Sequence, residues 1–342
     1  MGDKRQSVGA SVPLLLRSGL SLHSGSMRKA ILLYNPLSGS RQSRRQSDVE
    51  TALAALLAAG VEASTAPTLG TDGTAQQVKD AIAQGCDTVF ACGGDGTIHD
   101  VLQGLVGTEV ALGIIPLGTA NSLAHDLDLP SPPALAAQAA LAAASRRIAV
   151  GRVEYRDFEG KSHSRYFTVT VGVGVDAHLF YKLNPGAKRR LGMTAYYVKA
   201  TRLWLTHKME HFAVEIQGTH QACQAEVTQL LAVRIQNFGG VLRELAPGAS
   251  LERDDLRVVL FHTRSRMAYL TYIVRGLLGT SWRVPGIELM HSTSVACRRL
   301  SQSSSPSPRI LVEADGELLG TLPAEISVVP DAVSLLVPNL HQ

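Results

Sequence analysis

The amino-acid sequence predicts an α/β fold with an N-terminal, doubly wound parallel-sheet domain and a second, β-rich domain like an antiparallel sandwich. Two observations lead to this prediction. Short apolar runs alternate with helix-length amphipathic stretches from residue 27 to about residue 146, which is the pattern of a parallel sheet covered by helices on both faces. Beyond that point, strand-like runs separated by turn residues dominate, as in antiparallel sheets.

The elements of the first domain follow from apolar spacing and from helix end signals. Val49, Ala52 and Leu56 share one helical face, and Gly60 ends that helix. The predicted strands are 29–34, 61–66, 88–92 and 110–115. The predicted helices are 47–59, 71–84, 98–106, 121–126 and 134–144, the last opened by two prolines.

The second domain is expected over residues 147–330, with residues 331–342 packing back on the first domain. Its predicted helices are 190–208 and 265–279. Its predicted strands are 148–155, 166–171, 212–217, 229–236, 256–261, 287–296, 310–313 and 325–329. Residues 1–26 are rich in Ser and Gly, and their one apolar patch is too short for a secretory signal. We expect them to form a disordered tail before the first domain at 27–146.

Composition favours a cytoplasmic enzyme. The chain has 342 residues, of which 45% are hydrophobic, enough for two cores. No apolar run approaches the roughly 18–20 residues that span a bilayer. The four cysteines are scattered without metal-ligand spacing, so we expect reduced thiols. A net charge of +4 is too small to indicate nucleic-acid binding. Whether the chain forms a homodimer is left open.

A glycine-rich loop at residues 93–97 is the first candidate site. Gly93, Gly94, Asp95, Gly96 and Thr97 follow a predicted strand and precede a helix. Glycine lets the backbone approach a ligand, and the free N–H groups of a helix N-terminus favour phosphate. The Asp95 carboxylate suits a Mg²⁺ ion that bridges phosphate oxygens, or a ribose hydroxyl. The alternative is a glycine-rich turn without a ligand.

A second loop repeats this pattern. Gly118 and Thr119 follow the predicted strand 110–115, and Asn121 opens a helix. Side chains of Thr and Asn can form hydrogen bonds with a nucleotide that the backbone approaches closely. Asn35, at the end of the first strand, would face the same crevice, although Asn-Pro alone also indicates a plain turn.

The chain lacks a Walker A pattern, and its motifs resemble another group of enzymes. Gly93–Thr97 is the signature of diacylglycerol kinase catalytic domains, sphingosine kinases and NAD kinases. Three further segments resemble those of bacterial diacylglycerol kinase-like lipid kinases. They are the first nucleotide loop at 33–39, the second glycine loop at 115–124 and the Asp-Gly-Glu segment at 315–317.

This resemblance implies roles for the candidate residues. It assigns Asn35, the Gly93–Thr97 loop and Gly118, Thr119 and Asn121 to ATP, and it suggests Asp95 as a Mg²⁺ ligand. Phosphoryl transfer also needs an oriented hydroxyl, usually with a base beside it. Asp315 is the expected base, and Glu317 its orienting partner or a metal ligand. Asp-Gly on its own is a common hairpin turn.

Two departures from the family pattern are notable. Ala120 and Ser122 stand where many relatives have Gly and Asp. Relatives with a structural Mg²⁺ carry an Asp-Gly-x-Leu-Asp segment, whereas Arg253 and Arg257 occupy both acid positions here. Whether this chain has that metal site is therefore left open.

The sequence thus indicates an ATP- and Mg²⁺-dependent lipid kinase with diacylglycerol as the expected acceptor. A sphingoid-base kinase, an NAD kinase and a non-catalytic lipid-binding protein remain alternatives. A lipid acceptor requires the protein to associate peripherally with the inner face of the membrane. Residues 188–208 carry six basic and no acidic residues among aromatic ones, which favours an anionic membrane surface.

Overall fold

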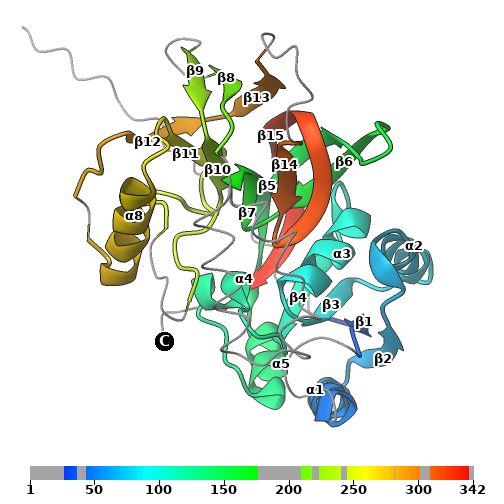
Figure 1. The fold of residues 1–342 in the computed structure, drawn as a ribbon. Coiled ribbons are helices and arrows are strands. Elements are labelled where there is room, and N and C mark those ends of the chain that lie inside the picture. The colour runs from blue at the N-terminus through cyan, green and yellow to red at the C-terminus, as the bar shows by residue number, and fades with distance from the viewer. Residues whose placement is uncertain are drawn as a thin grey trace, which may run out of the picture.

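The fold combines a helix-covered parallel sheet with a β-rich domain (Figure 1). It was obtained as a computed structural model, which describes residues 27–36, 44–175, 209–217, 223–239, 245–280, 282–300 and 309–338. Both parts of the fold predicted from the sequence are confirmed. The predicted helix at 190–208 lies outside the described residues.

Four parallel strands lie in the order β2-β1-β3-β4. Their bounds are β1 Lys29–Tyr34, β2 Glu62–Pro67, β3 Thr88–Gly93 and β4 Ala111–Pro116. The helices of this domain are α1 Arg45–Ala58, α2 Gly70–Ala83, α3 Asp95–Leu105, α4 Ser122–Asp126 and α5 Pro133–Leu141. The alternation of strands and helices therefore corresponds to that expected from the periodicity.

The two faces of this sheet carry separate cores, because successive side chains of a strand point to opposite sides. Val89 and Ala91 of β3 pack with residues of α2 and α3. Phe90 and Cys92 pack with residues of α1 and α5. The short apolar run of β3 is fully buried, as expected for a central parallel strand. Cys92 is therefore a core residue, and burial raises the pKa of its thiol.

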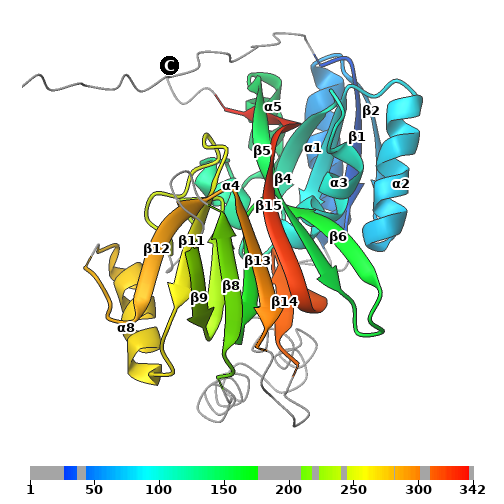
Figure 2. The same ribbon diagram turned by 90° about the horizontal axis from the view of Figure 1, so that it is seen from above.

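The β-rich domain packs two antiparallel layers on each other (Figure 2). Its first strands are β5 Ala144–Arg156, β6 Ser162–Phe167, β7 Thr170–Gly174, β8 Phe212–Gln217, β9 Cys223–Val227 and β10 Gln229–Val233. There follow β11 Leu256–Phe261, helix α8 Arg266–Leu278, β12 Ile287–Ser292, β13 Ser294–Arg299, β14 Leu311–Ala314 and β15 Glu317–Val337.

Strand β15 joins the two domains. Near its start it pairs with β14 and β13, and Ser334 and Leu335 near its end pair in parallel with β4. The sequence predicted only residues 325–329 as a strand here, because Pro323 and Pro330 interrupt the apolar pattern. The pairing with β5 shifts register at both places, so the strand continues past each proline through an irregularity.

Two further differences from the predicted elements have physical causes. Strand β9 was not predicted, because its residues are polar and mostly exposed, so no apolar run marks it. Helix α3 begins at Asp95 and not at residue 98. Its first turn is therefore formed by the glycine motif itself, and Gly94 provides the extended residue that precedes the helix.

Gly151 of β5 offers a test of the packing inside the β-rich domain. A Cβ atom at this position would lie 2.0 Å from Cζ of Phe167. We expect Gly151→Ala to lower the free energy of unfolding by about 1–3 kcal/mol, the usual cost of overpacking a core. Urea denaturation measures the change. Adding Phe167→Leu should recover part of the loss, and unchanged stability in Gly151→Ala would contradict the packing described here.

Candidate functional site at the glycine loops

The first glycine loop closes tightly on the start of α3. A Cβ atom on Gly93 would lie 2.1 Å from the hydroxyl oxygen of Thr97, so any side chain here would displace the buried Thr97. The backbone N–H groups at the beginning of α3 lie next to this loop, and the dipole of the helix adds positive potential there. This end of the helix can therefore bind a phosphate group.

The second glycine loop touches the first. Its Gly118 donates a backbone hydrogen bond to the carbonyl oxygen of Gly93 at 3.0 Å. A Cβ atom on Gly118 would lie only 2.3 Å from the Cα atom of Gly94. The two loops can approach this closely only because both residues are glycine.

Asn121 stabilises the second loop through its backbone conformation and its side-chain hydrogen bonds. It has a left-handed backbone conformation, with φ of 53°. Its Oδ1 accepts a hydrogen bond from the N–H of Gly118 at 2.8 Å, and its Nδ2 donates one to the carbonyl oxygen of Gly118 at 3.2 Å. The neighbouring Thr119 is exposed, so its hydroxyl is open to a ligand.

Asp95 ties the two loops together. Its carboxylate accepts backbone hydrogen bonds from Ser122 at 3.1 Å and from Leu123 at 3.2 Å. Burial raises the pKa of Asp95, the two N–H donors oppose this, and the nearby charge of Asp315 adds to it. Each oxygen has a further lone pair that could bind a cation or a hydroxyl.

Asp315 is buried, with its side chain only 1% exposed. The carboxylate accepts backbone hydrogen bonds from Thr168, Val169 and Thr170 at 2.9–3.0 Å. Its backbone has φ of 50°, which lets the chain turn sharply between β14 and β15. The three N–H donors make Asp315 the anchor of this hairpin.

Glu317 extends from the same hairpin to the first glycine loop. Its Oε1 lies 3.0 Å from the position of a Cβ atom on Gly96. The residue is open to solvent on one side, but surrounding protein atoms desolvate the carboxylate. Desolvation raises the pKa of Glu317, and the charges of Asp100 and Asp315 raise it further, against the effect of His99. Glu317 is therefore a carboxylate with a raised pKa next to the phosphate-binding turn.

Asn35 lies at the same edge of the sheet. It follows β1, whose last residue Tyr34 pairs with Cys92, directly before Gly93. The rest of the predicted first nucleotide loop, residues 37–39, lies outside the described residues. The structure thus brings the described candidates at the ends of β1, β3 and β4 to one edge of the sheet, as parallel strands require.

The sequence analysis did not single out His99. His99 is buried, and its Nδ1 lies 3.6 Å from Oδ2 of Asp315. The sequence did contain a signal for its proximity to the site: His99 follows Asp95 by four residues, and residues at that spacing share a helix face. His99 therefore links α3 to the Asp315 hairpin.

The described residues contain no group of three or more His, Cys, Asp or Glu side chains that could hold a metal ion. This arrangement still fits Mg²⁺ bound together with a nucleotide, because Mg²⁺ is commonly held by one or two carboxylates plus phosphate oxygens and water. Asp95 and Glu317 are the acids next to the glycine loops that could provide this.

The segment with arginines in the acid positions forms ion pairs instead. Arg253 binds the Asp255 carboxylate through both Nε and Nη2. His291 Nδ1 lies 3.2 Å from the same carboxylate. Since the guanidinium group occupies the oxygens of Asp255, the residues present do not fit a structural Mg²⁺ here.

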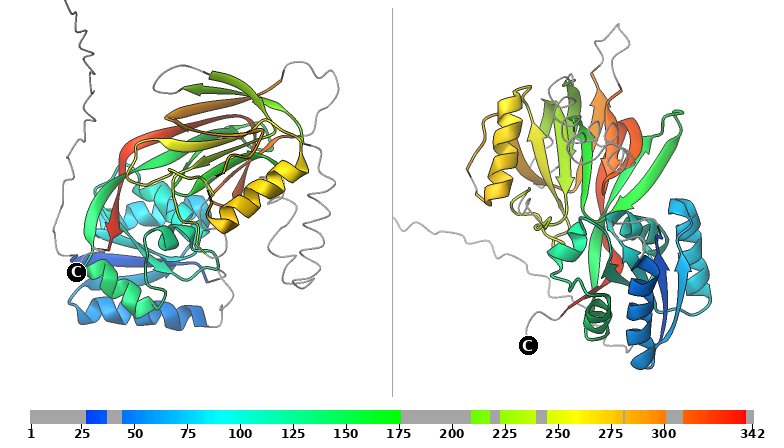
Figure 3. Two further views of the ribbon diagram at one scale, coloured as in Figure 1. Left: turned by 90° about the vertical axis from the view of Figure 1, so that its left-hand side faces the viewer. Right: turned by 60° about the horizontal axis from the view of Figure 1, so that its bottom comes forward.

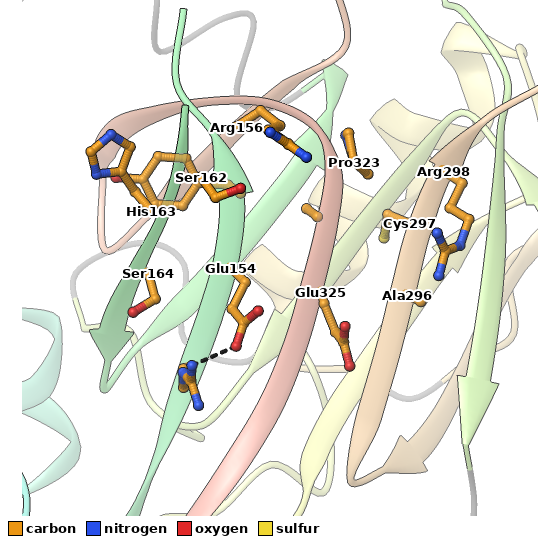
Figure 4. Close-up of a pocket in the computed structure, with 13 residues that line it drawn as sticks. Glu154, Arg156, Ser162, His163, Ser164, Ala296, Cys297, Arg298, Pro323 and Glu325 are labelled. Atoms are coloured by element: carbon orange, nitrogen blue, oxygen red, sulfur yellow. Dashed lines mark ion pairs between the residues drawn. The ribbon is translucent and has the colours of Figure 1, made fainter. Parts of the chain in front are cut away.

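A hollow of about 400 Å³ lies elsewhere, on the surface of the β-rich domain (Figure 4). It is lined by β5, β6, β13 and β15, and includes none of the predicted site residues. Two of its charged side chains, Arg152 and Glu154, form an ion pair at 2.5 Å. Neither glycine loop lines it.

Comparison with known proteins agrees with this geometry. Residues 29–153 match the diacylglycerol kinase catalytic domain, and residues 169–337 match the YegS C-terminal NAD kinase beta sandwich-like domain. A diacylglycerol kinase of Mycobacterium tuberculosis is 30% identical over 263 residues, covering 76% of this chain and 79% of that protein. The chain belongs to the bacterial diacylglycerol kinase-like lipid kinase family.

Other relatives cover more of the chain. A diacylglycerol kinase of Bacillus subtilis is 27% identical over 316 residues, with 92% of this chain and 97% of that protein covered. A crystal structure of a diacylglycerol kinase from Bacillus anthracis has a TM-score of 0.66 at 18% identity, covering 92% of this chain and 98% of that one. Yeast NADH kinase has the same fold, with a TM-score of 0.50 at 10% identity, covering 93% and 85%.

The contact between the glycine loops can be tested with Gly118→Ala. The added Cβ would force Gly94 and Gly118 apart, so we expect nucleotide affinity to fall by roughly tenfold or more. Titration with a fluorescent ATP analogue measures this, and circular dichroism checks the fold. Ala120→Gly in the same loop is the control and should bind as the parent does. Equal affinity in Gly118→Ala would contradict a nucleotide site at this contact.

Proposed function

We propose that this protein is an ATP- and Mg²⁺-dependent lipid kinase that converts diacylglycerol to phosphatidic acid. The observation that carries the proposal is the convergence of two touching glycine loops with the Asp-Gly-Glu hairpin. A family whose named members are diacylglycerol kinases supports the choice of acceptor. No helix in the described part of the chain is long and apolar enough to cross a membrane, so we propose that the kinase reaches its acceptor at the membrane surface.

In this proposal the glycine loops bind the phosphates of ATP. The N–H groups at the start of α3 and the backbone around Gly118 would contact phosphate oxygens, while Asn35 and Thr119 would contact the nucleotide. Mg²⁺, held through Asp95 and phosphate oxygens, would neutralise the charge that develops on the transferred group.

The sequence analysis assigned the role of general base to Asp315. We further propose that Glu317 is the base instead and that Asp315 has a positioning role. A general base must reach the hydroxyl proton of the acceptor. The Asp315 carboxylate is buried and accepts three backbone hydrogen bonds, whereas Glu317 is open to solvent and has a raised pKa. In this assignment Glu317 accepts the proton and Asp315 positions the hairpin.

Glu317→Gln and Asp315→Asn distinguish these roles. We expect Glu317→Gln to lower turnover roughly 100-fold or more with unchanged stability. Asp315→Asn should lower turnover and also the free energy of unfolding, by about 1–3 kcal/mol, because an amide cannot accept all three hydrogen bonds. Kinetics and urea denaturation measure both effects. Normal turnover in Glu317→Gln combined with normal stability in Asp315→Asn would overturn the assignment.

The pH dependence of turnover gives an independent check. Desolvation raises the pKa of Glu317 above its usual value of 4.5. If Glu317 must be deprotonated to act as the base, activity falls as the pH drops through this raised pKa. Glu317→Gln should lose that acidic limb and keep only a low, flat rate over the same range. An acidic limb that persists unchanged in the variant would assign it to another group.

Asp95→Asn tests the metal role. The amide keeps one acceptor oxygen for the second loop but loses the charge that attracts Mg²⁺. We expect ATP binding to the variant to gain much less from added Mg²⁺ than binding to the parent. Calorimetric titration of ATP with and without Mg²⁺ measures the difference, with the exposed Asp80→Asn on α2 as the control. The same metal dependence in parent and Asp95→Asn would show that Asp95 only joins the loops.

The acceptor is tested by a screen with radiolabelled ATP. The panel contains diacylglycerol, a sphingoid base, NAD and extracted lipids, with Glu317→Gln as the inactive control. We expect label in phosphatidic acid. Label in the sphingoid base or in NAD would identify that compound as the acceptor in place of diacylglycerol. ATP binding without any labelled product would favour a non-catalytic lipid-binding protein.

A further inference from the structure

Helix α8 of the β-rich domain has an apolar face that no described element covers. Its inner face is formed by Tyr269, Tyr272 and Gly276, which are buried against β10 and β11. Its exposed large apolar residues are Met267, Leu270, Ile273, Val274, Leu277 and Leu278. At 3.6 residues per turn these six positions fall within an arc of about 140°, directly opposite the buried face.

This arrangement is unusual for a helix packed on one side. The outer face of such a helix is normally polar, and single exposed apolar residues need no explanation, whereas a contiguous patch indicates a binding surface. Here Arg266, the first residue of the helix, is the one polar residue of α8 whose position falls within that arc. Trp282, which follows the helix in the chain, is also 42% exposed.

The charged residues of the chain segment that carries α8 are all positive. Between Asp255 and Glu288 the sequence contains no acidic residue. Arg264 and Arg283, which precede and follow the helix in the chain, are exposed. Arg275 does not belong to this surface, because it is buried and donates a hydrogen bond to the carbonyl oxygen of Leu245. An apolar face bordered by arginines complements an anionic lipid surface better than it complements an average protein surface.

Helix α8 lies on the domain that also carries the Asp315 hairpin. The helix lies at the outer edge of the β-rich domain, beside β11 and β12 (Figures 2 and 3). It packs on β10 through Leu231 and Val233. The chain that follows β10 returns to the nucleotide-binding domain, where Gln236 and Asn237 donate hydrogen bonds to Asp126 of α4. A membrane bound at α8 would thus lie on the domain that faces the glycine loops.

We propose that the outer face of α8 is the surface through which this protein docks on an anionic bilayer. The proposal rests on the proposed lipid kinase function, because that function explains why the protein would need to bind a membrane. The vesicle-binding test does not depend on that function. Leu270 and Leu277 insert among the acyl chains near the headgroups, and Arg264 and Arg283 contact anionic headgroups. The basic segment at 188–208, in which the sequence suggested membrane contact, lies outside the described residues.

Sedimentation with vesicles tests the docking directly. The probes are vesicles of phosphatidylcholine alone and of phosphatidylcholine with phosphatidylglycerol, at low salt, where the attraction between charges is strongest. We expect Leu270→Ser/Leu277→Ser to bind the anionic vesicles roughly tenfold or more weakly than the parent. Arg264→Ser/Arg283→Ser should lose most of the preference for anionic over neutral vesicles.

The matched control is Leu57→Ser/Leu135→Ser. These leucines of α1 and α5 are each 50% exposed, and they lie in the nucleotide-binding domain, away from α8 (Figure 1). The control should bind vesicles as the parent does. Equal vesicle binding by the α8 variant and the parent overturns the proposal, as does equal weakening in the control.

Two further measurements separate this proposal from its competitors. If size-exclusion chromatography shows a dimer for the parent and a monomer for Leu270→Ser/Leu277→Ser, the face is an interface between copies of the chain and the proposal is overturned. Phosphorylation of a short-chain, monomeric diacylglycerol should be unchanged in the α8 variant. If no lipid is phosphorylated but vesicle binding still depends on α8, the proposed kinase function fails and the docking surface stands.

Discussion

The buried carboxylate of Asp315 is the constraint that positions the site. A charged group inside a protein is costly unless hydrogen bonds replace its water. Three backbone N–H groups of residues 168–170 meet this requirement, and each bond to a charged acceptor contributes about 1.5–3 kcal/mol. The turn after β14 must therefore lie against the link between β6 and β7. Glu317, two residues further on, reaches the glycine loop as a result.

The nucleotide-binding and β-rich domains are held together by polar groups as well as by β15. The side-chain amide of Gln103 in α3 forms two hydrogen bonds with the backbone of Tyr166, at 2.9 Å each. Asp126 of α4 accepts two more from the chain after β10. Because these bonds satisfy backbone groups that no strand partner reaches, they fix the orientation of one domain on the other. The distance between the glycine loops and the Asp315 hairpin depends on that orientation.

The two glycine loops illustrate how tightly function constrains this sequence. Gly94 and Gly118 are glycine because their backbones approach each other, whereas Asp95 is constrained by the donors it bridges. A carboxylate here supports the loop geometry in the absence of any ligand. The same residue can then contribute its remaining lone pairs and its charge when a nucleotide and a cation are bound.

The sequence alone determined the fold class, most element positions and the two loops. Apolar periodicity is a local property, and strands β1, β3 and β4 and helix α8 were found within one or two residues. Asn35 and the glycine loops could be assigned to one edge because parallel strands present their carboxyl ends together. The chain also carried its family signature in the order of its motifs.

Only the tertiary structure decided which of the two acids is buried and which is open to solvent. That Asp315 is buried and Glu317 open depends on strand pairings between residues far apart in the sequence, such as Val312 with Val173. The role of His99 depends on the same packing, and the course of β15 past Pro323 depends on its long-range partners. The apolar outer face of α8 could not be recognised either, because periodicity identifies a helix but cannot say which of its faces the rest of the protein covers.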